Sequence, residues 1–333
     1  MKFGIFFTLD YPAKLADISP EQYFQQITEQ VKFAESLHFH SVWFTEQHFE
    51  SEAGLCPYPP VLMSYIAANT STIRLGSGVT LPALYNPIHL AESYALLDVL
   101  TGGRVDIGLG TSSIKNVYDL FGVTFSDRYL IRDKSADLLC SFWGCQRPSL
   151  ANPDQECLPS NIKLGLYPLQ KPHPPIWIST GTADRVKGIL KGGHSVLFDY
   201  LFCDFQKTNL EIFKSGVSTP DNIPPRKIGG VVYAQLQGIE TSYLYFRNFF
   251  EDFLKAQRGS MFELEPLWNN LQENGLILCC APDEAKRRVN QIAQSGLDLL
   301  LLGVGYGGMP HATTMSTIEL FAKEIMVDYL SVS

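Results

Sequence analysis

Short apolar runs alternate along the chain with longer stretches in which apolar residues recur every three or four positions. The first pattern predicts buried parallel strands and the second predicts amphipathic helices. Ser19-Pro20-Glu21 and Asn86-Pro87 each combine an N-capping side chain with a proline that suits the first helical position. The predicted strands are Lys2–Phe7, Ser41–Thr45, Ile73–Leu81, Val105–Leu109, Ile176–Ser179, Val196–Asp199, Gly230–Leu236 and Leu297–Gly303. The predicted helices run from Ser19 to about Leu37 and over Pro59–Ala68, Asn86–Leu100, Arg128–Phe142, Asp184–Leu190, Asp204–Lys214, Ser242–Gln257, Pro282–Ser295 and Thr313–Leu330.

Eight strands, each followed by a helix, predict an α/β fold of the (β/α)8 TIM-barrel type. Two stretches depart from the alternation, Gly144–Pro175 and Gly259–Gly275, and predict irregular insertions after the fourth and seventh strands. We therefore expect residues 1–333 to form a single barrel domain. A doubly wound open sheet is the competing architecture, but no GxGxxG motif opens the first predicted helix.

Composition narrows the function classes. The chain has 333 residues, of which 45% are hydrophobic and 18% charged, as expected of a soluble globular protein. The net charge is -8 and the basic residues are scattered, so no nucleic-acid partner is expected. No apolar run approaches the roughly 18 residues of a membrane span, and the first residues predict a strand rather than a signal peptide. The seven cysteines form no CxxC pair and the histidines no HExxH motif, which predicts no metal site and a reduced, cytoplasmic setting.

The most informative segment is the second predicted strand and the polar residues that follow it. Val42, Trp43 and Phe44 run without a turn-forming residue into Glu46, Gln47 and His48. In α/β barrels the carboxyl ends of the strands carry the chemistry, which makes Gln47 and His48 candidate catalytic residues. The alternative is that His48 caps or packs locally.

Other predicted strands also end in residues suited to a ligand. Two glycines within the third strand, ahead of Val79, suggest either a β-bulge or close approach of the backbone to a flat molecule. After the fourth strand, Thr111 and Ser112 offer hydroxyls to an anion, or form a plain turn. After the fifth, the residues from Thr180 to Arg185 lead into a helix, whose free amides can bind phosphate, or they merely cap that helix. Asp199-Tyr200, after the sixth strand, could flank a ring or pack at the rim. Asp10 and Tyr306 also fall in loops that follow strands and could line a pocket.

Taken together, these segments resemble the bacterial luciferase-like flavin monooxygenase family along nearly the whole chain. The segments that carry the resemblance are Val42–Phe49, Leu75–Val79, Asn86–Glu92, Leu96–Asp98, Thr101–Arg104 and Gly108–Gly110. Each is modest alone, and their order and spacing make the set specific.

The resemblance implies a (β/α)8 barrel that holds FMN at its carboxyl face, often beside a cis peptide bond at Gly78–Val79. It also implies that reduced flavin comes from a separate reductase and that, with O2, one oxygen atom is inserted into a small organic, mainly apolar substrate. A homodimer formed through the early helices is common in the family. The residues that the resemblance assigns to flavin are Gly78, Val79, Asp199 and Tyr200 beside the ring, and Thr111, Ser112, Thr180, Gly181, Thr182 and Arg185 toward the phosphate.

Two positions depart from the family pattern. Gln47 stands where the family commonly has the first histidine of Glu-His-His, and an amide cannot titrate. Either His48, which matches the second histidine, is the acid–base group, or the enzyme needs none there, or its activity is reduced. Thr111-Ser112 stand where the family often has an arginine on the phosphate, a role that Arg185 or Lys115 could take over. These departures leave open a flavin-binding protein without catalysis. A related barrel that transfers hydride with F420 is a separate alternative, which the net charge of -8 does not favour.

Overall fold

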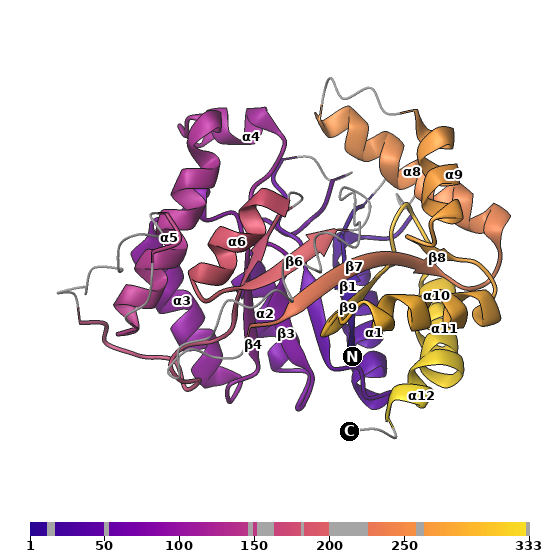
Figure 1. The fold of residues 1–333 in the computed structure, drawn as a ribbon, viewed down its shortest axis with the longest axis horizontal. Helices are drawn as coiled ribbons and strands as arrows, with labels where there is room; N and C mark the ends of the chain where they lie inside the picture. Colours follow the sequence, from indigo (N-terminus) through magenta and orange to yellow (C-terminus); the bar gives the residue numbers. More distant parts are fainter. Residues whose placement is uncertain are drawn as a thin grey trace. The chain divides into compact units, whose positions relative to one another are not determined.

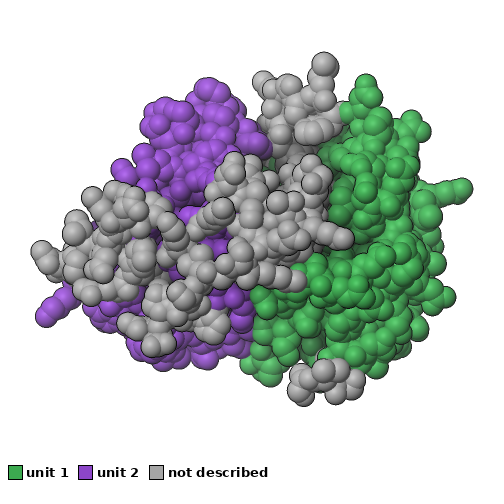
Figure 2. Space-filling view, viewed as in Figure 1, with its two compact units in different colours: residues 1–57, 69–73, 230–333 green, residues 58–68, 74–229 purple. Residues whose placement is uncertain are grey.

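The computed structural model describes residues 1–11, 17–49, 53–145, 149–151, 163–180, 183–199, 226–257 and 263–330. The chain divides into two compact units, which Figure 2 shows in different colours. The first unit comprises residues 1–57, 69–73 and 230–333, and the second comprises residues 58–68 and 74–229. The strands and helices alternate as in a (β/α)8 barrel, and the predicted fold class is confirmed.

The first unit is built around parallel strands in the order β2-β1-β9-β7-β8. Ile5 in β1 lies opposite Val42 in β2 on one side and Leu302 in β9 on the other. Strands of this kind are buried on both faces, which explains their nearly continuous apolar sequences. The strands are β1 (Lys2–Phe7), β2 (Ser41–Phe44), β7 (Ile228–Gln235), β8 (Leu278–Cys279) and β9 (Leu299–Val304). The helices are α1 (Pro20–Ser36), α8 (Ile239–Gln257), α9 (Leu264–Glu273), α10 (Pro282–Gln294), α11 (His311–Phe321), the π-helical η4 (Ala322–Met326) and α12 (Val327–Leu330).

The second unit contains parallel strands in the order β6-β5-β4-β3, and α3 packs beside α2 and α5 (Figure 1). The strands are β3 (Arg74–Ser77), β4 (Val105–Leu109), β5 (Ile176–Ser179) and β6 (Ser195–Asp199). The helices are α2 (Pro59–Ala67), α3 (Pro87–Leu100), α4 (Lys115–Leu120), α5 (Arg128–Phe142) and α6 (Ala183–Lys191), with short 3₁₀ turns η2 (Pro82–Leu84) and η3 (Phe125–Asp127).

Two predicted helix starts, at Ser19 and Asn86, are confirmed in atomic detail. Ser19 and Gln22 form a reciprocal capping box at the start of α1, in which each side chain accepts from the other residue's backbone N–H. Asn86 Oδ1 accepts a hydrogen bond from the Ile88 N–H, 2.9 Å away, at the start of α3. In both cases proline occupies the next position, where no backbone donor is needed.

Several elements differ from the prediction. The third strand is shorter than expected, because after Ser77 the backbone resumes pairing only at Thr80, opposite Leu109. The stretch after residue 259, predicted to be irregular, contains α9, which buries Trp268 and Leu271 on one face. The short elements α4 and β8 were not predicted. The predicted helix Asp204–Lys214 lies outside the described residues.

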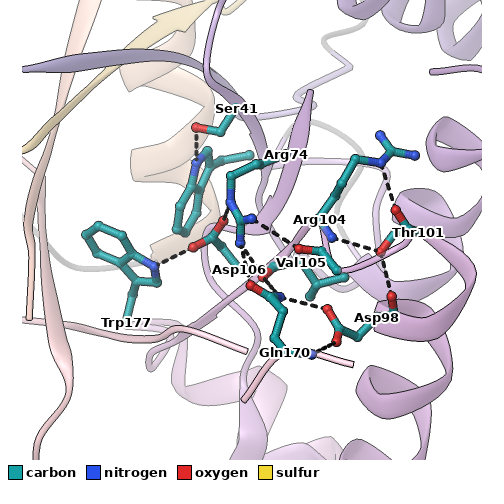
Figure 3. Close-up of polar contacts among 11 residues, drawn as sticks. Ser41, Arg74, Asp98, Thr101, Arg104, Val105, Asp106, Gln170 and Trp177 are labelled. Carbon is teal, nitrogen blue, oxygen red and sulfur yellow. Dashed lines mark hydrogen bonds and ion pairs between the residues drawn. The ribbon is translucent and has the colours of Figure 1, made fainter. Parts of the chain in front are cut away.

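A polar network joins the amino-terminal ends of β3, β4 and β5 in the second unit (Figure 3). Arg74 Nε lies 2.6 Å from Asp106 Oδ2, and Trp177 Nε1 donates to Asp106 Oδ1 at 3.0 Å. Gln170 accepts from Arg74 at 3.1 Å and donates through Nε2 to Asp98 Oδ1 at 2.7 Å. Since these side chains satisfy one another at the end of the strands away from the expected chemistry, we assign them to stability.

Candidate active site

The segment after β2 in the first unit holds a buried carboxylate against a buried histidine. His48 Nε2 lies 3.0 Å from Glu46 Oε1, and the exposed side-chain fractions are 7% for His48 and 0% for Glu46. The backbone around them is anchored separately, because the Gln47 N–H donates to the Cys56 carbonyl at 2.9 Å. The contact can orient the His48 imidazole.

Gln47, at the position where the resemblance expects a histidine, is half-buried. Its side chain lies against Gly54, where an added Cβ would come within 2.8 Å of Gln47 Cγ. Gly54 also has a φ of +151°, so this close approach depends on glycine. The Gln47 amide can donate and accept hydrogen bonds but cannot exchange a proton with a substrate.

The loops after β1 and β9 are tied together at the same strand ends. Asp10 is buried, and its Oδ2 accepts from the Gly307 N–H at 2.7 Å while Asn248 Nδ2 donates to the Gly307 carbonyl at 3.2 Å. Tyr306 is also buried, with its hydroxyl 3.3 Å from Cys279 Sγ. Burial, and then the neighbouring Cys279, raise the pKa of the Tyr306 phenol well above its ordinary value, so the hydroxyl stays protonated.

In the second unit, the ends of β3 and β4 approach each other closely. The peptide bond between Gly78 and Val79 is cis, as the family resemblance implies. Thr80 N donates to the Gly108 carbonyl at 2.8 Å, and Gly110 N donates to the Thr80 carbonyl at 2.9 Å. A Cβ at Gly110 would lie 2.2 Å from Val79 Cγ2, so only glycine allows this contact. Gly78 is buried and Val79 half-buried, as a surface that meets a ligand would be.

The loop after β4 carries Thr111 and Ser112, where the resemblance expects an arginine. Thr111 and Ser112 are both half-buried. The Ser112 N–H donates to the Tyr118 hydroxyl at 2.8 Å, which fixes the loop against α4. Lys115 forms an exposed ion pair with Asp119 on its own helix, 2.5 Å apart, and is therefore a weaker candidate for an added ligand contact.

A cationic cluster lies at the end of β5. Asp133 accepts from Arg132 through Oδ1, 2.6 Å from Arg132 Nη2, and from Arg185 through Oδ2, 2.8 Å from Arg185 Nη2. Arg132 Nη1 also donates to the Ser179 carbonyl at 3.0 Å, and the Arg185 guanidinium lies 4.5 Å from the centroid of the Tyr129 ring. Two guanidinium groups share one carboxylate, so the three groups keep a net positive charge.

The two arginines differ in their exposure. Arg132 is buried, and burial lowers the pKa of its guanidinium, an effect that Asp133 opposes. The Arg185 side chain is 31% exposed and can reach an added anion. Arg132 was missed by the sequence reasoning, although one signal was present: Arg132 and Asp133 continue the spacing of the buried residues Ala136 and Leu139 on α5.

The structure brings several predicted residues of the second unit to one edge of its strands. Pairing of Leu109 with Ile178 and of Ser179 with Leu197 aligns the ends of β4, β5 and β6. Thr180, which is buried, donates its N–H to the Leu197 carbonyl at 3.2 Å. Asp199 is the last residue of β6, whereas Gly181, Thr182 and Tyr200 lie outside the described residues. The structure thus aligns the backbone at the strand ends where the phosphate is expected. His48 and Gln47 belong to the first unit.

A metal site and a membrane-spanning helix were both looked for in the part of the chain that the structure describes. No group of three or more His, Cys, Asp or Glu side chains there could hold a metal ion. None of the helices formed by the described residues is both long and apolar enough to cross a membrane.

Comparison with known proteins gives both curated relatives and solved structures. The uncharacterized protein y4vJ of Sinorhizobium fredii is 30% identical over 168 residues, which are 50% of this chain and 47% of that protein. The oxygenase component of flavin-dependent trigonelline monooxygenase from Acinetobacter baylyi is 23% identical over 197 residues, 59% of this chain and 53% of that protein. The matched region therefore spans about half the length of these curated relatives.

Solved structures share the fold over almost the entire chain. Monooxygenase RslO1 from Streptomyces bottropensis has a TM-score of 0.80 and 23% identity, covering 99% of this chain and all of that one. The oxygenating constituent of 3,6-diketocamphane monooxygenase from Pseudomonas putida, in complex with FMN, has a TM-score of 0.72 and 16% identity, covering 98% of both chains. An F420-dependent secondary alcohol dehydrogenase has a TM-score of 0.70 and 14% identity, covering 97% of this chain and 98% of that one.

The family assignment rests on the sequence. The family model described as luciferase-like monooxygenase matches residues 1–201, more than half of the chain. This region contains β1 to β6, the His48 segment and the Arg185 cluster. The chain belongs to the luciferase-like monooxygenase family.

Proposed function

We propose that the protein is an FMN-dependent monooxygenase that uses reduced flavin and O2 to insert one oxygen atom into a small organic, mainly apolar substrate. The observation that carries the proposal is the cationic cluster of Arg132, Asp133 and Arg185 at the carboxyl end of β5. A phosphate is the anion that such a cluster fits, because guanidinium groups bind phosphate oxygens with directed, charge-assisted hydrogen bonds. The start of α6 at Ala183 adds the free amides of a helix N-terminus to the same end.

The described residues of the second unit fit a flavin beyond its phosphate. Gly110 lets the backbone pack tightly on Val79. The hydroxyl residues Thr111 and Ser112 directly follow Gly110 in the sequence. We assign Gly78 and Val79, with Asp199 and Tyr200, to the ring, and Thr180, Gly181, Thr182 and Arg185 to the phosphate. Reduced flavin, when bound, supplies the electrons with which O2 is activated.

We assign the proton chemistry to the segment after β2 in the first unit. His48 is the acid–base group, since a histidine side chain can both accept and release a proton. Gln47 orients the substrate through its amide. A separate reductase is the proposed source of reduced flavin, supported by the relative that is an oxygenase component.

We also propose a homodimer that uses the exposed apolar side chains of α2 and α3. Val61 and Tyr65 on α2 are 66% and 51% exposed, and Leu96 and Leu100 on α3 are 49% and 67% exposed. Because α2 and α3 pack side by side, these residues lie on neighbouring helices. Light scattering should give twice the chain mass, and Leu100→Glu should shift it toward the monomer.

The test of the function combines binding and isotope incorporation. Titrations with FMN, riboflavin and F420 should show tightest binding of FMN. A supplied flavin reductase, NADH and ¹⁸O₂ should then place one labelled oxygen atom in an aldehyde, ketone, alkane or thioether. Preferential F420 binding with reduction of bound F420 by an alcohol would instead establish the hydride-transferring alternative, which one structural neighbour represents. Flavin binding without labelled product across these substrates would establish the non-catalytic alternative.

A further inference from the structure

Glu46 is a buried acid for which the proposed function has so far no separate role. Its side chain has no exposed surface, and it lies two residues before His48. Moving a carboxylate out of water is strongly unfavourable unless the charge is paired and hydrogen-bonded. His48 Nε2 is a bonded partner at 3.0 Å.

Other hydrogen bonds also hold the local backbone. The segment is fixed by hydrogen bonds from Gln47 N to the Cys56 carbonyl and from Leu55 N to the Leu9 carbonyl, at 2.9 and 3.0 Å. Thr45 Oγ1 adds a bond to the Thr8 carbonyl at 2.5 Å. These contacts hold the loop in addition to the contact between Glu46 and His48.

The hydrogen-bond chemistry assigns the two nitrogens of the His48 ring. An ionised carboxylate only accepts hydrogen bonds, so a ring nitrogen that faces an ionised Glu46 carries a proton. In neutral His48 the proton therefore lies on Nε2, and the lone pair lies on Nδ1. The same logic governs histidines oriented by a carboxylate in other enzymes, where the orienting group sets the tautomer and stabilises the imidazolium.

We propose that Glu46 is a positioning residue that holds the neutral His48 proton on Nε2 and thereby makes Nδ1 the atom that accepts a proton during turnover. When a reacting group releases its proton to Nδ1, both ring nitrogens carry hydrogen, and the positive charge is balanced by Glu46. Return of that proton from Nδ1 restores the neutral ring. This inference rests on the proposed function for the role of His48 in turnover, but the position of the proton is a property of the free protein.

The first test reads the ring directly. Protein labelled with ¹⁵N-histidine has seven histidines, and the signals of His48 are those lost in His48→Gln. Long-range ¹H–¹⁵N correlation at a pH where the ring is neutral should show His48 protonated at Nε2, with a low-field proton on that nitrogen. Glu46→Met should remove the low-field signal. A neutral ring protonated at Nδ1, or a low-field signal that persists in Glu46→Met, would overturn the proposal.

The second test separates positioning from stability. Glu46→Gln should lower kcat on the order of tenfold or more with little change in KM or melting temperature, and Glu46→Asp should recover part of the loss. Glu29→Gln is the matched control, because it removes a carboxylate 3.3 Å from His311, another histidine of the first unit, and should leave kcat unchanged. Loss of kcat only in proportion to loss of melting temperature would overturn the proposal. If wild-type protein shows the predicted tautomer but incorporates no oxygen, the proposed function fails and the tautomer assignment stands.

Discussion

Replacing Arg185 with alanine tests whether the cationic cluster of the second unit binds the flavin phosphate. The change removes the 2.8 Å hydrogen bond to Asp133 Oδ2 and the guanidinium that lies 4.5 Å from the Tyr129 ring centroid. Arg132 keeps its bonds to Asp133 Oδ1 and to the Ser179 carbonyl, so the buried part of the cluster stays paired. The fold should therefore persist, and the effect should appear in ligand binding.

The magnitude follows from the contacts of Arg185. A charge-assisted hydrogen bond to phosphate contributes about 1–2 kcal/mol here, since the guanidinium must share its charge with Asp133. This free energy corresponds to a loss of roughly 5- to 30-fold in FMN affinity. The side chain is 31% exposed, so solvent screens the Asp133 pair, and we expect a stability loss of less than about 1 kcal/mol.

The assay compares two ligands that differ only in the phosphate. FMN and riboflavin are titrated against wild-type protein and Arg185→Ala, and the ratio of the two affinities isolates the phosphate contact. Affinity for FMN should fall while affinity for riboflavin stays within about twofold. Arg247→Ala is the matched control, because Arg247 is an exposed arginine of α8, 3.7 Å from Glu251. Equal weakening of both ligands, or no weakening of either, would refute the assignment of Arg185 to the phosphate.

Four further outcomes are expected. His48→Ala should lower turnover far more than it lowers the melting temperature, with the exposed His89→Ala as control; parallel losses in activity and stability would argue against an acid–base role. Arg132→Met should lower the free energy of unfolding by about 3–5 kcal/mol in urea titrations, because it leaves Asp133 buried with one cation fewer, and a loss below about 1 kcal/mol would contradict this. Gly307→Ala should destabilise the fold by about 2 kcal/mol or more, since the new Cβ would lie 1.9 Å from the Tyr245 carbonyl oxygen. Gly305→Ala is the control: Gly305 has a similar positive φ but an added Cβ there makes only ordinary contacts, so the loss in the same titrations should be smaller. Burial acts to raise the pKa of Glu35, but hydrogen bonds from the backbone N–H groups of Thr72, Ile73 and Ser71 lower this pKa overall. The stabilisation that Glu35 provides is therefore present at neutral pH and is lost as the pH falls from the ordinary carboxyl range through the lowered pKa. In urea titrations at several pH values, Glu35→Gln should reduce the loss of stability at acid pH, and an unchanged loss would exclude the effect.

The architecture could be predicted largely from the sequence because it depends on local patterns. Buried parallel strands require continuous apolar runs, and all eight predicted strands correspond to strands of the structure. Caps such as Ser19 and Asn86 act within their own turn, so their spacing suffices to place a helix start. The order and spacing of several motifs also predicted the family, which the match over residues 1–201 confirms. The prediction was wrong for α9, although its apolar residues Leu264, Leu267, Trp268 and Leu271 recur at helical spacing.

The tertiary structure decided which side chains meet. Period and polarity place a residue on a face, but the partner of a side chain depends on its direction and on elements far away in sequence. Asp10 meets the Gly307 backbone across 297 positions, and Arg185 of α6 meets Asp133 of α5 across 52. Neither contact can be inferred from the sequence around either residue. The sequence by itself therefore determined a (β/α)8 scaffold and the strand ends that carry Gln47, His48 and Thr111. Only the tertiary structure decided that Glu46 faces His48 Nε2 and that Arg132 and Arg185 share the Asp133 carboxylate. Such contacts form only when the chain is folded.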